Sequence, residues 1–240
     1  MDRFVRLLAS VTSEAEARLA AHAGADIIDC KDPAAGALGA LPHEVVARIR
    51  ENVPEHIPVS ATVGDLLAEP ELVLHAARAM AATGCDIVKV GLFPGGDAEA
   101  TVAHLGRNLA ESTSLVAVLM ADAPRERALV PALGEAGFVG VMLDTASKDG
   151  RTLLDHCGPD ALRAFIAEAH AAGLFAGLAG SLRIAQIPEL LTLQPDVLGF
   201  RGALCRASDR RSALDASALG DVRRAIPQAA CAPRTLETTS

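Results

Sequence analysis

The chain has 240 residues, half of them apolar, and carries a formal net charge of −8 with no Trp and no Tyr. The apolar content excludes a disordered chain, and the negative charge without stacking residues argues against a nucleic-acid partner. Among its 22 lysines and arginines, only Lys31, Lys89 and Lys148 are lysines. Because arginine does not give up its proton in proteins, chemistry that needs a side-chain amine must use these three residues.

The sequence contains no signal of export or of membrane insertion. The N-terminus lacks the apolar stretch of a signal peptide, and no apolar run approaches the length of a membrane span. The five cysteines form no C-x-x-C pair, and the seven histidines show no ligand spacing. We therefore expect a cytoplasmic protein without a metal site.

Short apolar runs alternate with amphipathic stretches, which predicts strands that alternate with helices. In chain order, the predicted strands are 4–9, 27–30, 59–63, 87–90, 115–120, 140–143, 175–179 and 197–200. The predicted helices between them are 14–22, 42–50, 71–82, 98–111, 125–136, 161–171 and 213–226.

Glycines mark the predicted joints between helix and strand. Gly24, Gly84, Gly137 and Gly173 stand where a helix must end, a place that favours a left-handed residue. Eight such units predict an α/β fold, the (β/α)8 or TIM barrel, with an open doubly wound sheet as the competing fold. We expect a single barrel domain over residues 1–227 and a flexible C-terminal tail over 228–240.

Polar residues follow several predicted strands, at the edge where barrel active sites lie. Asp29 and Lys31 share one face of the second strand because they are two residues apart. Lys89 lies inside the fourth strand, and Asp144 and Lys148 follow the sixth. All three lysines thus fall at or just past strand ends, which indicates positions that need a primary amine.

Lys89 stands among the apolar residues Ile87, Val88 and Val90. Such surroundings favour a neutral amine, which can form an imine with a carbonyl group or act as a base. The alternative is a structural ion pair with an aspartate in the barrel mouth. Asp29 and Asp144 could either transfer protons or serve only to orient other groups.

Loops of small residues follow the seventh and eighth strands, where TIM barrels often bind phosphate through backbone N–H groups. Arg201 and Ser181 are candidate side-chain donors, and plain tight turns are the alternative interpretation. The candidate binding residues are Ser60, Thr62, Gly180, Ser181, Arg201 and Gly202.

Seven segments carry motifs that can be compared with a known family. They are 24–33 (GADIIDCKDP), 36–40 (GALGA), 59–65 (VSATVGD), 86–92 (DIVKVGL), 142–150 (MLDTASKDG), 178–181 (LAGS) and 199–205 (GFRGALC). In these motifs the chain resembles the (5-formylfuran-3-yl)methyl phosphate synthases of methanofuran biosynthesis, also called 4-(hydroxymethyl)-2-furancarboxaldehyde-phosphate synthases. The segments around 66–71, 93–96 and 122–125 depart mildly from the family pattern.

The resemblance implies a TIM-barrel lyase that condenses two molecules of glyceraldehyde 3-phosphate into (5-formylfuran-3-yl)methyl phosphate, with loss of phosphate and water. It also implies that Lys31 forms a Schiff base, that Lys89 accepts a proton, and that Asp29, Asp144 and Lys148 lie in the site. No metal or organic cofactor is expected, because the imine itself is the electron sink.

Two other functions remain compatible with the residues. Another Schiff-base aldolase, acting on a different sugar phosphate, would catalyse reversible aldol cleavage. A non-catalytic barrel that only binds a sugar phosphate would keep three lysines at an electrostatic cost without using them. In each case the expected partner is a small molecule, with no nucleic acid and no membrane, and the sequence leaves room for a homo-oligomer.

Overall fold

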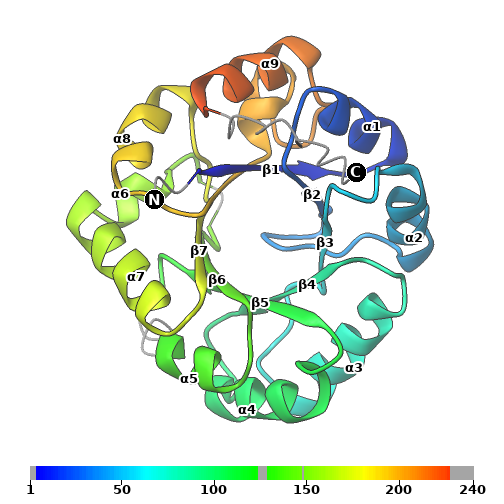
Figure 1. The fold of residues 1–240 in the computed structure, drawn as a ribbon, viewed down its shortest axis with the longest axis vertical. Helices are drawn as coiled ribbons and strands as arrows, with labels where there is room; N and C mark the ends of the chain where they lie inside the picture. Colours follow the sequence, from blue (N-terminus) through cyan, green and yellow to red (C-terminus); the bar gives the residue numbers. More distant parts are fainter. Residues whose placement is uncertain (1–3, 124–128, 148, 228–240) are drawn as a thin grey trace, which may run out of the picture.

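A computed structural model describes residues 4–123, 129–147 and 149–227. Eight parallel strands form a closed barrel in chain order, and the helices surround it (Figure 1). The predicted TIM barrel is confirmed, and an open doubly wound sheet is excluded because the first strand pairs with the eighth. The tail predicted over 228–240 lies outside the described residues.

The eight strands follow one another in the order that the sequence predicts, and helices lie between them. The strands are β1 (Arg6–Val11), β2 (Ile27–Cys30), β3 (Val59–Thr62), β4 (Ile87–Leu92), β5 (Ser114–Met120), β6 (Gly140–Asp144), β7 (Phe175–Leu178) and β8 (Val197–Phe200). The α-helices are α1 (Glu14–His22), α2 (His43–Asn52), α3 (Pro70–Ala81), α4 (Ala98–Leu109), α5 (Val130–Glu135), α6 (Leu153–His156), α7 (Pro159–Ala171), α8 (Ile187–Thr192) and α9 (Ala216–Ala225).

The first strand begins and ends later in the chain than predicted, and this difference affects a residue of the site. It runs over Arg6–Val11 instead of 4–9, and Phe4 is 52% exposed. Because Phe4 and Val5 are apolar, the predicted strand begins too early. The short helices α6 and α8 were not predicted, because four to six residues are too few to show a helical period. Part of the predicted helix 125–136 lies outside the described residues.

Three aspartates tie neighbouring strands together at the N-terminal edge of the barrel. Asp26, Asp86 and Asp196 directly precede β2, β4 and β8. Each carboxylate accepts a 2.7 Å hydrogen bond from a backbone N–H of an adjacent strand and pairs with an arginine or histidine side chain. Asp26 and Asp86 come two residues after glycines with positive φ, Gly24 (+85°) and Gly84 (+82°). The glycines that recur in the sequence therefore mark the turn that leads from a helix to the next strand.

The barrel interior changes from apolar to polar toward the C-terminal ends of the strands. Side chains along a barrel strand alternate between interior and exterior, so residues two apart occupy successive interior layers. On β1, β2 and β4 the lower interior side chains are Leu8, Ile27 and Ile87, and the upper ones are Ser10, Asp29 and Lys89.

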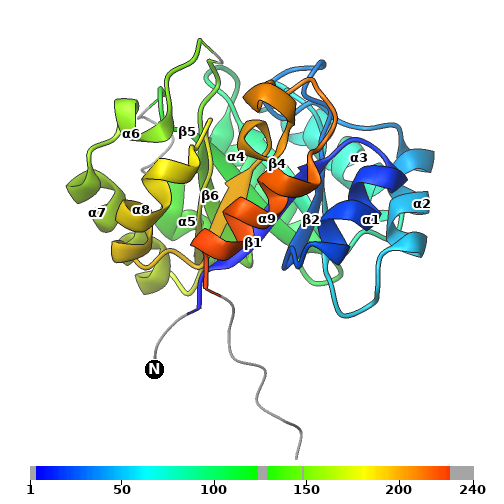
Figure 2. The ribbon, with the colours of Figure 1, turned by 90° about the horizontal axis from the view of Figure 1, so that it is seen from above.

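The loops that follow the strands gather on one side of the barrel, and the turns after β8 lie among them (Figure 2). This side carries the polar layer. Within the described ranges, no helix is long and apolar enough to cross a membrane.

Candidate active site

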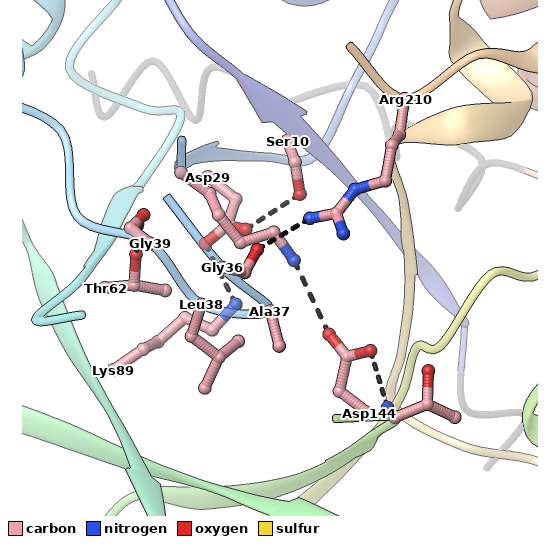
Figure 3. Close-up of polar contacts among 12 residues, drawn as sticks. Ser10, Asp29, Gly36, Ala37, Leu38, Gly39, Thr62, Lys89, Asp144 and Arg210 are labelled. Atoms are coloured by element: carbon pink, nitrogen blue, oxygen red, sulfur yellow. Dashed lines mark hydrogen bonds and ion pairs between the residues drawn. The ribbon is translucent and has the colours of Figure 1, made fainter. Parts of the chain in front are cut away.

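A cavity of about 580 Å³ opens at the C-terminal ends of the strands. Its wall includes Asp29, Lys31, Lys89 and Asp144, together with the loops after β7 and β8. Barrel closure brings Asp29 of β2, Lys89 of β4 and Asp144 of β6 to one place, as the positions of the strand ends predict (Figure 3). Lys31, directly after β2, lines the same cavity.

Asp29 is the centre of a buried hydrogen-bond network. Its Oδ1 accepts from Lys89 Nζ at 2.9 Å and from Ser60 Oγ at 2.7 Å, and its Oδ2 accepts from Ser10 Oγ at 2.9 Å. Burial raises the pKa of Asp29, but the charges of Lys89 and Lys31 and the bond from Ser60 together outweigh burial and lower it. Asp29 is therefore a carboxylate at neutral pH.

The Lys89 side chain is 4% exposed, as its apolar sequence neighbours suggest. Its closest charged partner, however, is the carboxylate of Asp29 at 2.9 Å. The ion pair that the sequence left as an alternative is thus present. It lies in the cavity wall, so the contact positions Lys89 beside any bound molecule.

Lys31 stands directly after β2 and faces a second carboxylate. Its Nζ lies 3.4 Å from Asp144 Oδ2, and Asp144 Oδ1 accepts from the backbone N–H of Thr145 at 2.7 Å. This distance is at the long end for a charged hydrogen bond, so Lys31 is held less tightly than Lys89.

The predicted binding residues on β3, Ser60 and Thr62, donate to protein acceptors. Ser60 supports Asp29, and Thr62 Oγ1 donates to the carbonyl of Gly39 at 3.0 Å (Figure 3). Asp65 fixes the same loop, since its carboxylate accepts from the backbone N–H of Leu38 at 2.7 Å. We therefore interpret Ser60 and Thr62 as positioning residues for the cavity wall.

Arg201 lies just after β8, but its guanidinium donates to acceptors within the protein instead of being open to a phosphate. Nε donates to the carbonyl of Arg210 at 2.9 Å, Nη1 to Glu16 Oε2 at 2.6 Å and Ser10 O at 3.1 Å, and Nη2 to Glu16 Oε1 at 3.3 Å and Ser212 O at 2.9 Å. These contacts engage all five N–H groups of the guanidinium. The predicted phosphate contact does not fit this geometry, because Glu16, 185 positions away in the chain, occupies the side chain.

Gly180, Ser181 and Gly202 line the cavity at the predicted anion-binding loops. Gly180 and Ser181 both have positive φ, +106° and +52°, and a Cβ at Gly180 would lie 3.0 Å from Thr145 Cγ2. The backbone of this loop is therefore close to the β6 loop, and its anion-binding role remains a prediction. Lys148 lies outside the described residues.

Known proteins give these residues a family context. A family model described as 4-HFC-P synthase matches residues 7–223. The chain belongs to the 4-HFC-P synthase family. It is therefore an enzyme, as the clustered lysines suggest.

Relatives in this family match most of the chain. The (5-formylfuran-3-yl)methyl phosphate synthases of Methanococcus maripaludis (strain S2) and Methanocaldococcus jannaschii are 40% and 39% identical over 217 residues, which is 86% of this chain and 92% of each relative. A protein of Methylorubrum extorquens, provisionally assigned the same activity, is 43% identical over 230 residues, 93% of this chain and 94% of that protein.

Solved structures confirm the fold of this 4-HFC-P synthase family member. Phosphoribosyl anthranilate isomerase from Thermus thermophilus has a TM-score of 0.65 at 17% identity, covering 92% of this chain and 98% of that chain. The 3-hexulose-6-phosphate synthase of Salmonella typhimurium has a TM-score of 0.65 at 19% identity, covering 91% and 98%.

Ser10 and Arg210 are polar cavity residues of this family member that the sequence did not indicate. Ser10 could have been found, because it stands two residues after Leu8 in a buried strand, but the predicted strand ended at position 9. Arg210 is partly buried, and its Nη2 donates to the carbonyl of Gly36 at 2.9 Å. No sequence signal distinguishes it from the exposed Arg211 beside it.

Proposed function

We propose that this enzyme condenses two molecules of glyceraldehyde 3-phosphate into (5-formylfuran-3-yl)methyl phosphate in methanofuran biosynthesis, in the cytoplasm. Its relatives with this activity support the product. The observation that carries the mechanism is the pair of lysine–aspartate contacts in one cavity, Lys31 with Asp144 and Lys89 with Asp29.

Lys31 is the imine-forming residue in this proposal. Asp144, 3.4 Å from Lys31 Nζ, is placed to take the proton that the ammonium must lose. The neutral amine then attacks the aldehyde carbon of the first triose phosphate, a C–N bond forms, and the carbonyl oxygen leaves as water. The resulting iminium ion withdraws electrons and acidifies the neighbouring carbon.

Lys89 acts as the proton acceptor. Asp29, 2.9 Å from Lys89 Nζ, first takes the proton that the Lys89 ammonium must lose. The neutral amine then takes the proton from the carbon beside the imine, which gives an enamine and an ammonium on Lys89. One proton leaves with the phosphate in the next step, which restores the pair of Lys89 and Asp29. Because Ser10 and Ser60 fix both oxygens of Asp29, the Lys89 amine is held in one position for this transfer.

The enamine expels the phosphate of the imine-bound triose as inorganic phosphate, which leaves an enol as the carbon nucleophile. Its terminal carbon, the one that carried the phosphate, attacks the central carbon of the second triose, which reacts in its ketone form. Ring closure and loss of two water molecules complete the furan. Asp144 and Lys148 assist these proton transfers. Hydrolysis of the imine releases the product and regenerates the Lys31 amine.

The first test supplies glyceraldehyde 3-phosphate alone and follows ultraviolet absorbance and free phosphate together. The chain has no Trp and no Tyr, so the protein contributes little absorbance where a furan aldehyde is detected. We expect both signals to rise in step. Aldol products without a furan would favour the aldolase alternative, and no product at high enzyme concentration would favour a barrel that only binds.

The second test identifies the imine lysine. Borohydride added during turnover reduces the imine to a stable amine, and mass spectrometry then locates the modified residue. We expect the adduct on Lys31, its loss in Lys31→Met, and an adduct on Lys31 without formation of the furan in Lys89→Met. An adduct on Lys89 alone would contradict the assignment, and no adduct on any lysine would remove the imine mechanism.

A further inference from the structure

Among the described residues, Arg210 is a cavity-lining cation that takes part neither in the lysine chemistry nor in an ion pair. Lys31, Lys89 and Arg201 line the cavity, and each contacts a carboxylate at 3.4 Å or less. Arg210 also lines it, yet no carboxylate of the described residues lies at ion-pair distance from its guanidinium. Its contact is a hydrogen bond from Nη2 to the carbonyl of Gly36 at 2.9 Å.

The backbone of Arg210 is fixed by the buried network behind it. Arg201 Nε donates to the carbonyl of Arg210 at 2.9 Å, and Arg201 is itself held by Glu16. The preceding residue, Asp209, closes its own turn by accepting from the backbone N–H of Arg211 at 3.0 Å. The side chain is therefore presented from a rigid turn, which lowers the entropic cost of binding a ligand.

The guanidinium of Arg210 points into the site, toward the Gly36 carbonyl (Figure 3). Burial lowers the pKa of Arg210, and this outweighs the opposing charges of Asp144 and Asp65. The group is thus partly removed from water, and within the described ranges neither carboxylate comes to ion-pair distance of it. The Gly36 carbonyl accepts one N–H of the guanidinium and orients the guanidinium plane. The other N–H groups of Arg210 are then available to a ligand.

We propose that Arg210 binds a phosphate group of the substrate, the one that does not occupy the loop at Gly180 and Ser181. This inference rests on the proposed function for the identity of the ligand, because two triose phosphates bring two phosphates into one cavity. A planar guanidinium matches phosphate oxygens with two parallel N–H donors. Arg210 is then a substrate-positioning residue on the β8 side of the cavity.

Arg183 is the other cavity-lining arginine without a carboxylate contact among the described residues, and it donates to the carbonyl of Gly150 at 3.0 Å. Its side chain is exposed, whereas Arg210 is partly buried. Water competes more strongly for an exposed cation, so the geometry favours Arg210.

The direct test measures binding of radiolabelled inorganic phosphate to the resting enzyme by equilibrium dialysis. Arg210→Gln should lose one bound phosphate, with affinity at that site reduced about 10- to 100-fold. Arg210→Lys should recover part of the loss, because it keeps the charge. Arg211→Gln is the matched control, since it removes the same charge from the exposed neighbour and should bind like the wild type.

A kinetic test separates ligand contact from a structural role. Arg210→Gln should raise the KM for glyceraldehyde 3-phosphate at least about tenfold, while the borohydride adduct on Lys31 still forms at saturating substrate. A lower unfolding midpoint with unchanged KM and phosphate binding would overturn the inference. So would loss of phosphate binding in Arg183→Gln but not in Arg210→Gln.

The two proposals fail in distinguishable ways. If no furan is formed but Arg210→Gln still loses a phosphate, the anion site stands and the proposed function does not. If the furan is formed and Arg210→Gln binds phosphate like the wild type, the proposed function stands and the anion site does not. A wild-type enzyme that binds no phosphate would also overturn the site.

Discussion

Replacing Asp29 by Asn tests the buried ion pair on which the active site is built. The substitution keeps the shape of the side chain but removes its charge. Asp29 is completely buried and the Lys89 side chain is 4% exposed, so the ammonium would be left uncompensated in the barrel interior. Removal of one partner of such a pair typically costs about 3–5 kcal/mol.

The geometry agrees with this magnitude. Two unit charges at the 2.9 Å separation of Lys89 and Asp29 attract by about 6 kcal/mol at an effective dielectric constant of about 20, and desolvation offsets part of that attraction. Asp29→Asn should therefore lower the free energy of unfolding by about 3–5 kcal/mol. The double variant with Lys89→Met removes both charges and should recover most of the loss.

Urea unfolding followed by far-ultraviolet circular dichroism measures these differences, since the chain has no Trp for fluorescence. The matched control is Asp160→Asn, which breaks an exposed contact with Arg163 and should change stability by at most about 1 kcal/mol. The reasoning is refuted if Asp29→Asn costs no more than this control. It is also refuted if the losses of the two single variants simply add in the double variant.

Two further predictions concern the network and the loop behind the site. Burial raises the pKa of Glu16, but hydrogen bonds from Arg201 and backbone groups outweigh it, so the pKa is lowered from 4.5. A lowered pKa stabilises the fold above pH 4.5, and this contribution is lost as the pH falls through the pKa of the folded state. When the free energy of unfolding is measured against pH in acid, it should therefore fall less steeply in Glu16→Gln than in the wild type. Gly36 has φ +131° and an added Cβ would overlap the Asp65 carboxylate, whereas Gly84 has φ +82° and open space. Urea unfolding should show Gly36→Ala about 1–3 kcal/mol less stable than Gly84→Ala, and equal losses would contradict the steric argument.

The local patterns of the sequence were sufficient for the fold and for the positions of Lys31 and Lys89. Periods of two and of about 3.6 residues locate most strands and helices, and glycines locate the joints. Strand ends of a closed parallel barrel meet at one edge, so Asp29, Lys31, Lys89 and Asp144 could be placed together before any contact was seen. Only the first strand was displaced, and that error concealed Ser10.

The partners of these side chains were decided by the tertiary structure. Closure of the barrel and its stagger set which carboxylate faces which amine, so Lys89 meets Asp29 across 60 positions and Arg201 meets Glu16 across 185. No local pattern encodes such a pairing, because it depends on the relative positions of distant strands. For the same reason the sequence assigned phosphate binding to Arg201, whereas the fold engages Arg201 internally and presents Arg210 to the cavity.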